Sequence, residues 1–187
     1  MPFAPNVDRS LRWRPVGDDG LEHLTLRAGP DGVTASSVLI GERGGRRYGV
    51  SYRIDCDAAW RVRRLDLLTS DGTALQLRSD GDGHWQDGAG EPVPQFRGCI
   101  DIDLAGTPFT NTLPIRRLDL PQGGRAELAM LYVPFDDFVP CVDGQIYTAI
   151  EPGACYRYEA ADRSFAAELA VDEDGLVTDY PGLFERC

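Results

Sequence analysis

Residues 107–117 carry the densest set of side chains that could hold a polar ligand. They read Thr-Pro-Phe-Thr-Asn-Thr-Leu-Pro-Ile-Arg-Arg and directly follow a strand-like stretch. Hydroxyl, amide and guanidinium groups all donate hydrogen bonds, and guanidinium groups also pair with anions. We therefore select Asn111, Thr112, Arg116 and Arg117 as residues that contact the polar part of a small ligand.

Asp101 and Asp103 are the candidates for acid–base chemistry in this region. Side chains two residues apart on a strand share a face and lie roughly 7 Å apart. Such a pair could act on a sugar, where the separation of two carboxyl groups decides the mechanism. The alternative is structural: Arg116 and Arg117 would clamp Asp101 and Asp103 across the sheet, because charges away from water are usually paired.

A second acid–base pair is conceivable in Glu22 with His23, since the chain holds only two histidines. The motifs of other chemistries are missing. The chain has no Gly-x-Ser-x-Gly nucleophile turn and no Cys-x-x-Cys pair. The glycine-rich stretch 41–45 lacks a phosphate-binding lysine, and the acidic turn at 80–91 does not match a calcium loop. We select no catalytic residue and expect neither a cofactor nor a metal.

Apolar and polar residues alternate with a period of two along much of the chain, which predicts antiparallel strands. In 48–56, for example, the large apolar side chains fall on one face. Turn signals such as Asp-Gly separate ten or so of these runs at hairpin spacing. Within 60–68 the apolar phase flips, which predicts a β-bulge that curves the sheet.

One short helix is predicted within this β-rich chain. Thr110 to Thr112 are good N-cap residues, and Pro114 fits the first turn that follows. Residues 1–16 and 89–97 have no clear period and are predicted to be irregular. Because no internal repeat or linker separates the strands, we expect residues 1–187 to form a single domain.

Tryptophan and tyrosine side chains are spread over several of the predicted strands. Most such rings belong to a core, yet a curved sheet with an aromatic concave face could hold the apolar part of an amphiphile. We select Trp60, Tyr147 and Tyr156 as residues that line this concave face. The polar head of the ligand would then meet the arginine, asparagine and threonine donors of 107–117.

The charge of the chain argues against two kinds of partner. Its formal net charge is −11, and its 19 basic residues are all arginines. Nucleic acids and anionic membrane surfaces attract basic faces, so we expect neither as a partner. No apolar run approaches the roughly 18 residues of a membrane-spanning helix. Residues 1–8 lack the basic and apolar parts of an export signal, which predicts a cytoplasmic protein.

Several stretches resemble a bacterial family described as putative glycolipid-binding, formerly a domain of unknown function. The block 107–118 is the most specific of them, and 20–24, 98–103 and 156–159 belong to the same set. The resemblance implies a mostly β fold in which a long curved antiparallel sheet forms a half-barrel around short helical structure. This architecture is similar to the lipoprotein-carrier and lipid-binding half-barrels of bacterial envelopes.

Three functions are compatible with these observations. The first is non-enzymatic binding of an amphiphile, such as a glycolipid or lipid-linked sugar, in a concave cavity of the sheet. The second is an enzyme that acts on a sugar or lipid-linked substrate through Asp101 and Asp103, or through Glu22 and His23. The third is a scaffold or interaction protein with no small-molecule site. The resemblance favours the first, and the oligomeric state stays open.

Overall fold

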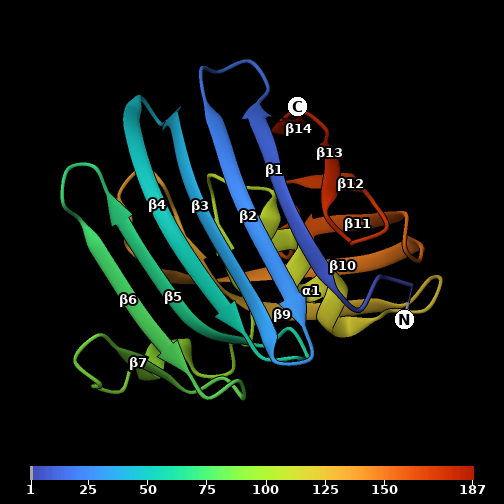
Figure 1. Cartoon of the computed structure of the whole chain (residues 1–187), viewed down its shortest axis with the longest axis horizontal. Coiled ribbons are helices and arrows are strands. Elements are labelled where there is room, and N and C mark those ends of the chain that lie inside the picture. Colours follow the sequence, from blue (N-terminus) through green and yellow to red (C-terminus); the bar gives the residue numbers. More distant parts are fainter. Residues whose placement is uncertain (1) are drawn as a thin grey trace.

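The computed structural model describes residues 2–187, which form one 14-stranded sheet (Figure 1). The strand order is β7-β6-β5-β4-β3-β2-β1-β14-β13-β12-β11-β10-β9-β8. Neighbouring strands are antiparallel, with the exception of β8 and β9, which run parallel. The fold is thus mostly β, and its single curved sheet is not closed, as the resemblance implied.

Most strands are paired with the strand that precedes them in the chain, so tight turns connect them. The strands are β1 (Val7–Pro15), β2 (Leu21–Gly29), β3 (Gly32–Arg43), β4 (Arg46–Cys56), β5 (Val62–Thr69), β6 (Ala74–Ser79), β7 (Trp85–Asp87), β8 (Ile102–Leu104), β9 (Arg125–Val133), β10 (Cys141–Glu151), β11 (Cys155–Ala160), β12 (Ala166–Val171), β13 (Val177–Tyr180) and β14 (Phe184–Arg186). The helical segments are η1 (Pro94–Phe96), η2 (Phe109–Asn111) and α1 (Thr112–Leu118).

The sheet bends so that its two halves face each other. β1 to β6 form one wall, β9 to β12 form the other, and α1 lies between them (Figure 1). The two walls are joined where β1 pairs with β14. Because η2 and α1 run through the interior of this half-barrel, the polar block 107–117 is enclosed between the walls.

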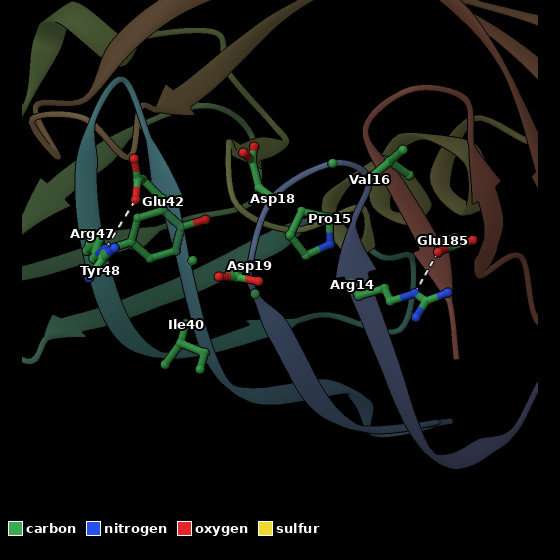
Figure 2. Close-up of a pocket in the computed structure, with 13 residues that line it drawn as sticks. Arg14, Pro15, Val16, Asp18, Asp19, Ile40, Glu42, Arg47, Tyr48 and Glu185 are labelled. Atoms are coloured by element: carbon green, nitrogen blue, oxygen red, sulfur yellow. Dashed lines mark hydrogen bonds and ion pairs between the residues drawn. The ribbon is translucent and has the colours of Figure 1, made fainter.

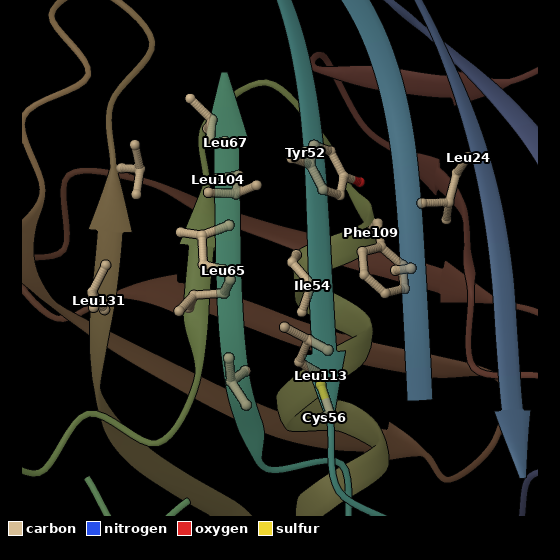
Figure 3. Close-up of a cluster of buried hydrophobic side chains, with 14 of the residues drawn as sticks. Leu24, Tyr52, Ile54, Cys56, Leu65, Leu67, Leu104, Phe109, Leu113 and Leu131 are labelled. Carbon is tan, nitrogen blue, oxygen red and sulfur yellow. The ribbon is translucent and has the colours of Figure 1, made fainter. Parts of the chain in front are cut away.

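The space between the walls is filled by apolar side chains (Figure 3). Leu24 and Ile54 come from one wall, Leu131 from the other, and Phe109 and Leu113 from the helical segment between them. Each of these five side chains is 0% exposed. Full burial of such a side chain contributes about 1.5–3 kcal/mol, so this cluster holds the two walls together.

The alternation, the bulge and the short helix predicted from the sequence are confirmed. Val62 and Leu65 are both buried with two residues between them, and the register of β4 and β5 shifts at this point. The assignment of residues 1–16 as irregular is wrong, because β1 occupies Val7–Pro15. Four strands were missed in all: β1, β7, β13 and β14. The last three have only three or four residues, too few for a period of two to be recognised.

Candidate functional site

α1 divides the predicted polar residues between two cavities. Asn111 lies at its N-terminal end, whereas Arg116 and Arg117 lie in its last turn. A helix of seven residues is about 10 Å long. The N-terminal end faces a cavity of about 360 Å³, and the C-terminal end faces one of about 610 Å³. We call these the tyrosine cleft and the arginine cavity, and no described residue lines both.

Arg117 pairs with Asp101, which confirms one half of the predicted clamp. Arg117 Nε lies 3.0 and 3.1 Å from the two carboxylate oxygens, and Nη2 donates to Oδ2 at 2.5 Å. The Asp101 side chain is 1% exposed. Burial raises the pKa of Asp101, and the guanidinium of Arg117 opposes that rise. This forked pair ties α1 to the segment before β8, so both charges have a structural role.

The other half of the predicted clamp is wrong, since Arg116 contacts neither Asp101 nor Asp103. Its Nη1 donates to the carbonyl oxygen of Asp174 at 2.9 Å, and its Nη2 donates to that of Ala4 at 2.8 Å. The guanidinium carbon lies 4.3 Å from the ring centroid of Trp60. Arg116, Arg117 and Trp60 together line the arginine cavity.

The tyrosine cleft is built from strands of both walls. Arg43 comes from the end of β3, Asp103 from β8, Tyr132 from β9, Tyr158 from β11 and Tyr180 from β13. Asp103 and Tyr132 are direct partners in the paired strands β8 and β9, and β11 and β13 belong to the same half of the sheet. The curvature of the sheet brings Arg43 to them from the opposite wall. The cleft therefore combines three phenol groups, a guanidinium and three carboxylates, since Asp143 and Asp162 also line it.

The hydroxyl groups of Tyr132, Tyr158 and Tyr180 have no hydrogen-bond partner among residues 2–187. Tyr158 and Tyr180 are only 8% and 7% exposed, so their rings are held firmly by the fold. Burial raises the pKa of all three phenols, and the negative charge of Asp103 adds to this rise. They are therefore neutral at ordinary pH and can each donate a hydrogen bond into the cleft.

A buried hydrogen-bond network fixes the polar groups at the inner end of the cleft. Asp103 accepts from Thr110 Oγ1 at 2.9 Å and from Gln145 Nε2 at 2.7 Å. The hydroxyl of Tyr147 donates to Asn111 Oδ1 at 2.9 Å. Among residues 2–187, Asp103 forms no ion pair with an arginine. Burial raises its pKa, and the hydrogen bonds from Gln145 and Thr110 and the charge of Arg43 oppose that rise. Asn111 thus lines the cleft, and Tyr147 supports it from behind.

Aromatic rings continue from the cleft to the surface. The ring centroids of Tyr158 and Phe165 are 6.1 Å apart, and those of Phe165 and Tyr180 are 6.2 Å apart. Phe184 follows at 6.3 Å from Tyr180. Phe165 is 38% exposed and forms the rim. A ligand in the cleft would therefore meet aromatic rings at the mouth, beside the exposed side chains of Asp162 and Ser164, and the hydrogen-bonded groups of Asp103 and Asn111 further in.

Two of the selected residues lie away from both cavities. Thr112 is 0% exposed, and its hydroxyl has no partner among the described residues. Tyr156 is 1% exposed, and its hydroxyl accepts a hydrogen bond from Gly153 N at 3.0 Å. Both side chains are enclosed by the fold, and neither lines the tyrosine cleft or the arginine cavity.

Glu22 and His23 do not form an acid–base pair, because neighbouring residues of β2 point to opposite faces of the sheet. Glu22 is buried, and its Oε1 accepts hydrogen bonds from Tyr52 and Ser37, each at 2.7 Å. His23 lies on the exposed outer face. The geometry thus separates the two groups that the enzymatic alternative would join.

A wider hollow of about 840 Å³ lies at the edge of the sheet, between the β1–β2 and β3–β4 turns (Figure 2). Four of its charged groups are paired with each other: Arg14 with Glu185 at 2.6 Å and Arg47 with Glu42 at 3.2 Å, whereas Asp18 and Asp19 form no ion pair among residues 2–187. Exposed ion pairs of this kind are solvated and contribute little. The hollow therefore offers fewer unpaired groups to a ligand than the tyrosine cleft does.

The sequence analysis missed Arg43, Tyr132, Tyr158, Tyr180 and Phe165 as cleft residues. One signal was present in the sequence: Tyr158 lies two residues after Tyr156, so both were expected on one face of a strand. The remaining four lie on separate strands or turns. Their convergence depends on which strands face each other across the half-barrel, and strand alternation carries no information on that.

Together, these features define a class: an open, curved β-sheet wrapped around a buried helix, with an aromatic cleft between its walls. The chain belongs to the family described as Putative glycolipid-binding, whose model matches residues 10–186. It is similar in fold to the crystal structure of a DUF1089 family protein from Pseudomonas aeruginosa, with 45% sequence identity and a TM-score of 0.79. That match covers 89% of this chain and 92% of the other.

No curated protein matches the chain. No helix among residues 2–187 is long and apolar enough to cross a membrane.

Proposed function

We propose that the chain binds an amphiphile with a sugar head, a glycolipid or a lipid-linked sugar, and that the tyrosine cleft holds the sugar. The observation that carries this proposal is that three unpartnered phenol hydroxyls line the same cleft as the carboxylate of Asp103, close enough for its charge to act on all three phenols. A sugar both donates and accepts hydrogen bonds, and its C–H faces pack on aromatic rings. Phenol donors, a carboxylate acceptor and aromatic rings are the groups that such a ligand needs.

The arrangement of polar and apolar groups gives the ligand a direction. The sugar would lie against Asp103 and Asn111, and the first carbons of the tail would leave over Phe165 and Phe184. The tail has no room inside the half-barrel, because the core cluster fills it. The family description supports the same ligand class.

Calorimetric titration with octyl glycosides of several sugars, below their micelle concentrations, tests this proposal. We expect at least one octyl glycoside to bind more tightly than 1-octanol, because 1-octanol offers no sugar. The Tyr158→Phe and Tyr180→Phe variants should each weaken that binding about 3- to 10-fold, since each loses one hydrogen bond.

Tyr156→Phe is the matched control, because Tyr156 lies on the same strand but its hydroxyl is bound to the backbone of Gly153. This variant should bind the glycoside as the parent does. Equal effects of Tyr156→Phe and Tyr158→Phe, or equal affinity for the glycosides and 1-octanol, would place the ligand elsewhere. If the glycoside binds in the tyrosine cleft, native mass spectrometry of the protein after exposure to a lipid extract of its own host would identify the natural head group.

A further inference from the structure

The arginine cavity is a second cavity that the proposed sugar site does not use. Beside Arg116 and Arg117, its walls are mostly carbon, from Phe3, Pro5, Pro30, Ala58, Ala59 and Trp60. It lies at the opposite end of α1 from the tyrosine cleft, and the buried helix separates the two. An occupant of the arginine cavity would therefore meet one cationic end and a large apolar wall.

Arg116 is a buried cation without a carboxylate partner among the described residues. The acidic residues whose charges act on Arg116 are Asp174 and Asp172. Asp174 already pairs with Arg9 at 2.8 Å, and Asp172 pairs with Arg186 at 2.6 Å. Arg117 is likewise neutralised by Asp101. Arg116 is therefore the cation of this cavity that forms no ion pair among the described residues, and the carboxylates of Asp172 and Asp174 act on it only from a distance.

Part of the Arg116 guanidinium faces the cavity. A guanidinium has five N–H donors, and backbone carbonyls take two of those of Arg116. Among residues 2–187, Nε of Arg186 is a buried side-chain nitrogen with no hydrogen-bond partner, and no nitrogen of Arg116 is in that state. Arg116 lines the cavity, and its three remaining N–H groups have no partner among residues 2–187, so they are the donors available to an anion there.

Trp60, whose ring packs on the Arg116 guanidinium, has a strained backbone conformation. Trp60 has a φ of +64°, which is rare for a bulky side chain. Its turn is fixed by Asp57, whose backbone oxygen accepts from Trp60 N at 2.9 Å. The ring of Phe3 also packs on the Arg116 guanidinium, with 5.3 Å between the guanidinium carbon and the ring centroid. Two aromatic rings thus keep water from much of Arg116, which strengthens its attraction for an anion.

We propose that the arginine cavity binds an organic anion with an apolar body, of the class of aliphatic carboxylates. The carboxylate would pair with the free N–H groups of Arg116, and the carbon chain would lie against Trp60 and Phe3. A guanidinium and a carboxylate match each other in a forked geometry. This site is independent of the sugar site, so each can fail without the other.

Calorimetric titration with decanoate, 1-decanol and acetate at neutral pH separates the contributions of charge and chain. Decanoate should bind at least 10-fold more tightly than 1-decanol, which lacks the charge. Acetate lacks the chain and should show no measurable binding, because each buried methylene strengthens binding about 3- to 4-fold. The Arg116→Met variant, if it folds, should lose the preference for decanoate over 1-decanol.

A cavity-filling variant tests the location without touching Arg116. Ala59 is exposed on the cavity wall, so Ala59→Phe should reduce decanoate affinity at least 10-fold. Ala89→Phe is the matched control: both alanines are exposed, and each backbone N–H donates to the aspartate two residues earlier, at 3.0 and 2.9 Å.

Three outcomes would overturn the proposal: no binding of decanoate, equal binding of 1-decanol, or equal effects of Ala59→Phe and Ala89→Phe. If decanoate is instead lost in Tyr158→Phe, the anion binds in the tyrosine cleft and the arginine cavity proposal fails. The sugar proposal would still stand or fall on the octyl glycosides alone.

Discussion

Arg116 and Arg117 are neighbours in the sequence with different partners in the fold. Arg117 neutralises a buried carboxylate, whereas Arg116 bonds to backbone carbonyls and faces a cavity. The residue types predicted that both contact the polar part of a ligand, and this stays a prediction. Which arginine pairs with Asp101 depends on where Asp101 lies relative to the end of α1. The composition and spacing of the sequence do not predict that position.

The pair of Arg117 and Asp101 should dominate the stability of this region. Arg117→Ala leaves the Asp101 carboxylate buried and unpaired, so we expect a loss of about 3–5 kcal/mol in urea unfolding. Arg14→Ala removes an exposed ion pair and should cost at most about 1 kcal/mol. The Asp101→Asn/Arg117→Met double variant should recover part of the loss. Similar costs for Arg14→Ala and Arg117→Ala would show that the pair is not a clamp.

Glu22 should make the protein less stable as the pH rises. Burial raises its pKa, because hydrogen bonds from Tyr52, Ser37 and Thr107 offset only part of the lost hydration. A carboxyl group with a raised pKa in the folded state contributes stability below its unfolded pKa of about 4.3 and loses it as the pH rises through the folded pKa.

Glu22→Gln removes this dependence, because its amide is neutral at every pH. We expect the variant to be about 1–2 kcal/mol more stable than the parent at pH 8. The difference should shrink towards pH 4, where Glu22 is protonated in the parent too. Urea unfolding at both pH values measures it. A variant that is less stable than the parent at pH 8 would contradict the assignment of a buried, poorly compensated carboxylate.

At the scale of the elements, alternation predicted which face of each long strand is buried. On β3, Leu39 is 3% exposed and Ile40 is 63% exposed, although they are adjacent and similar in size. Leu39→Ala should therefore cost about 2–5 kcal/mol, and Ile40→Ala about 0.5 kcal/mol or less, in thermal or urea unfolding. Equal losses at the two positions would mean that the outer face of β3 is covered by something else in solution.

The short elements were harder to predict than the long ones. β1 was missed because Arg9 interrupts its run of inward apolar residues; Arg9 is tied to Asp174 instead of facing water alone. The short helix was found because its N-cap residues and Pro114 are local signals. Local chemistry therefore predicted turns, strand faces and the short helix, although the N-cap Asn111 forms no side-chain capping hydrogen bond. Elements stabilised by distant partners were not predicted.

At the scale of the whole molecule, both cavities lie where one curved, open sheet wraps around one buried helix. The sequence predicted the curved half-barrel through its resemblance to the family, whereas alternation alone predicted ten or so of its 14 strands. It could not predict that the core would fill the concave face, which moves any ligand from the middle of the half-barrel to its two ends. The single domain, the cytoplasmic location and the absence of a nucleic-acid partner stay predictions.

The most direct test of the sugar-binding account is NMR of the protein with ¹³C-labelled tyrosine rings. The chain has seven tyrosines, so each signal can be followed separately. On titration with the tightest octyl glycoside, the signals of Tyr132, Tyr158 and Tyr180 should shift together, while those of Tyr52 and Tyr156 stay in place. Shifts confined to other tyrosines, or no shift at ligand saturation, would contradict the claim that the tyrosine cleft holds the sugar.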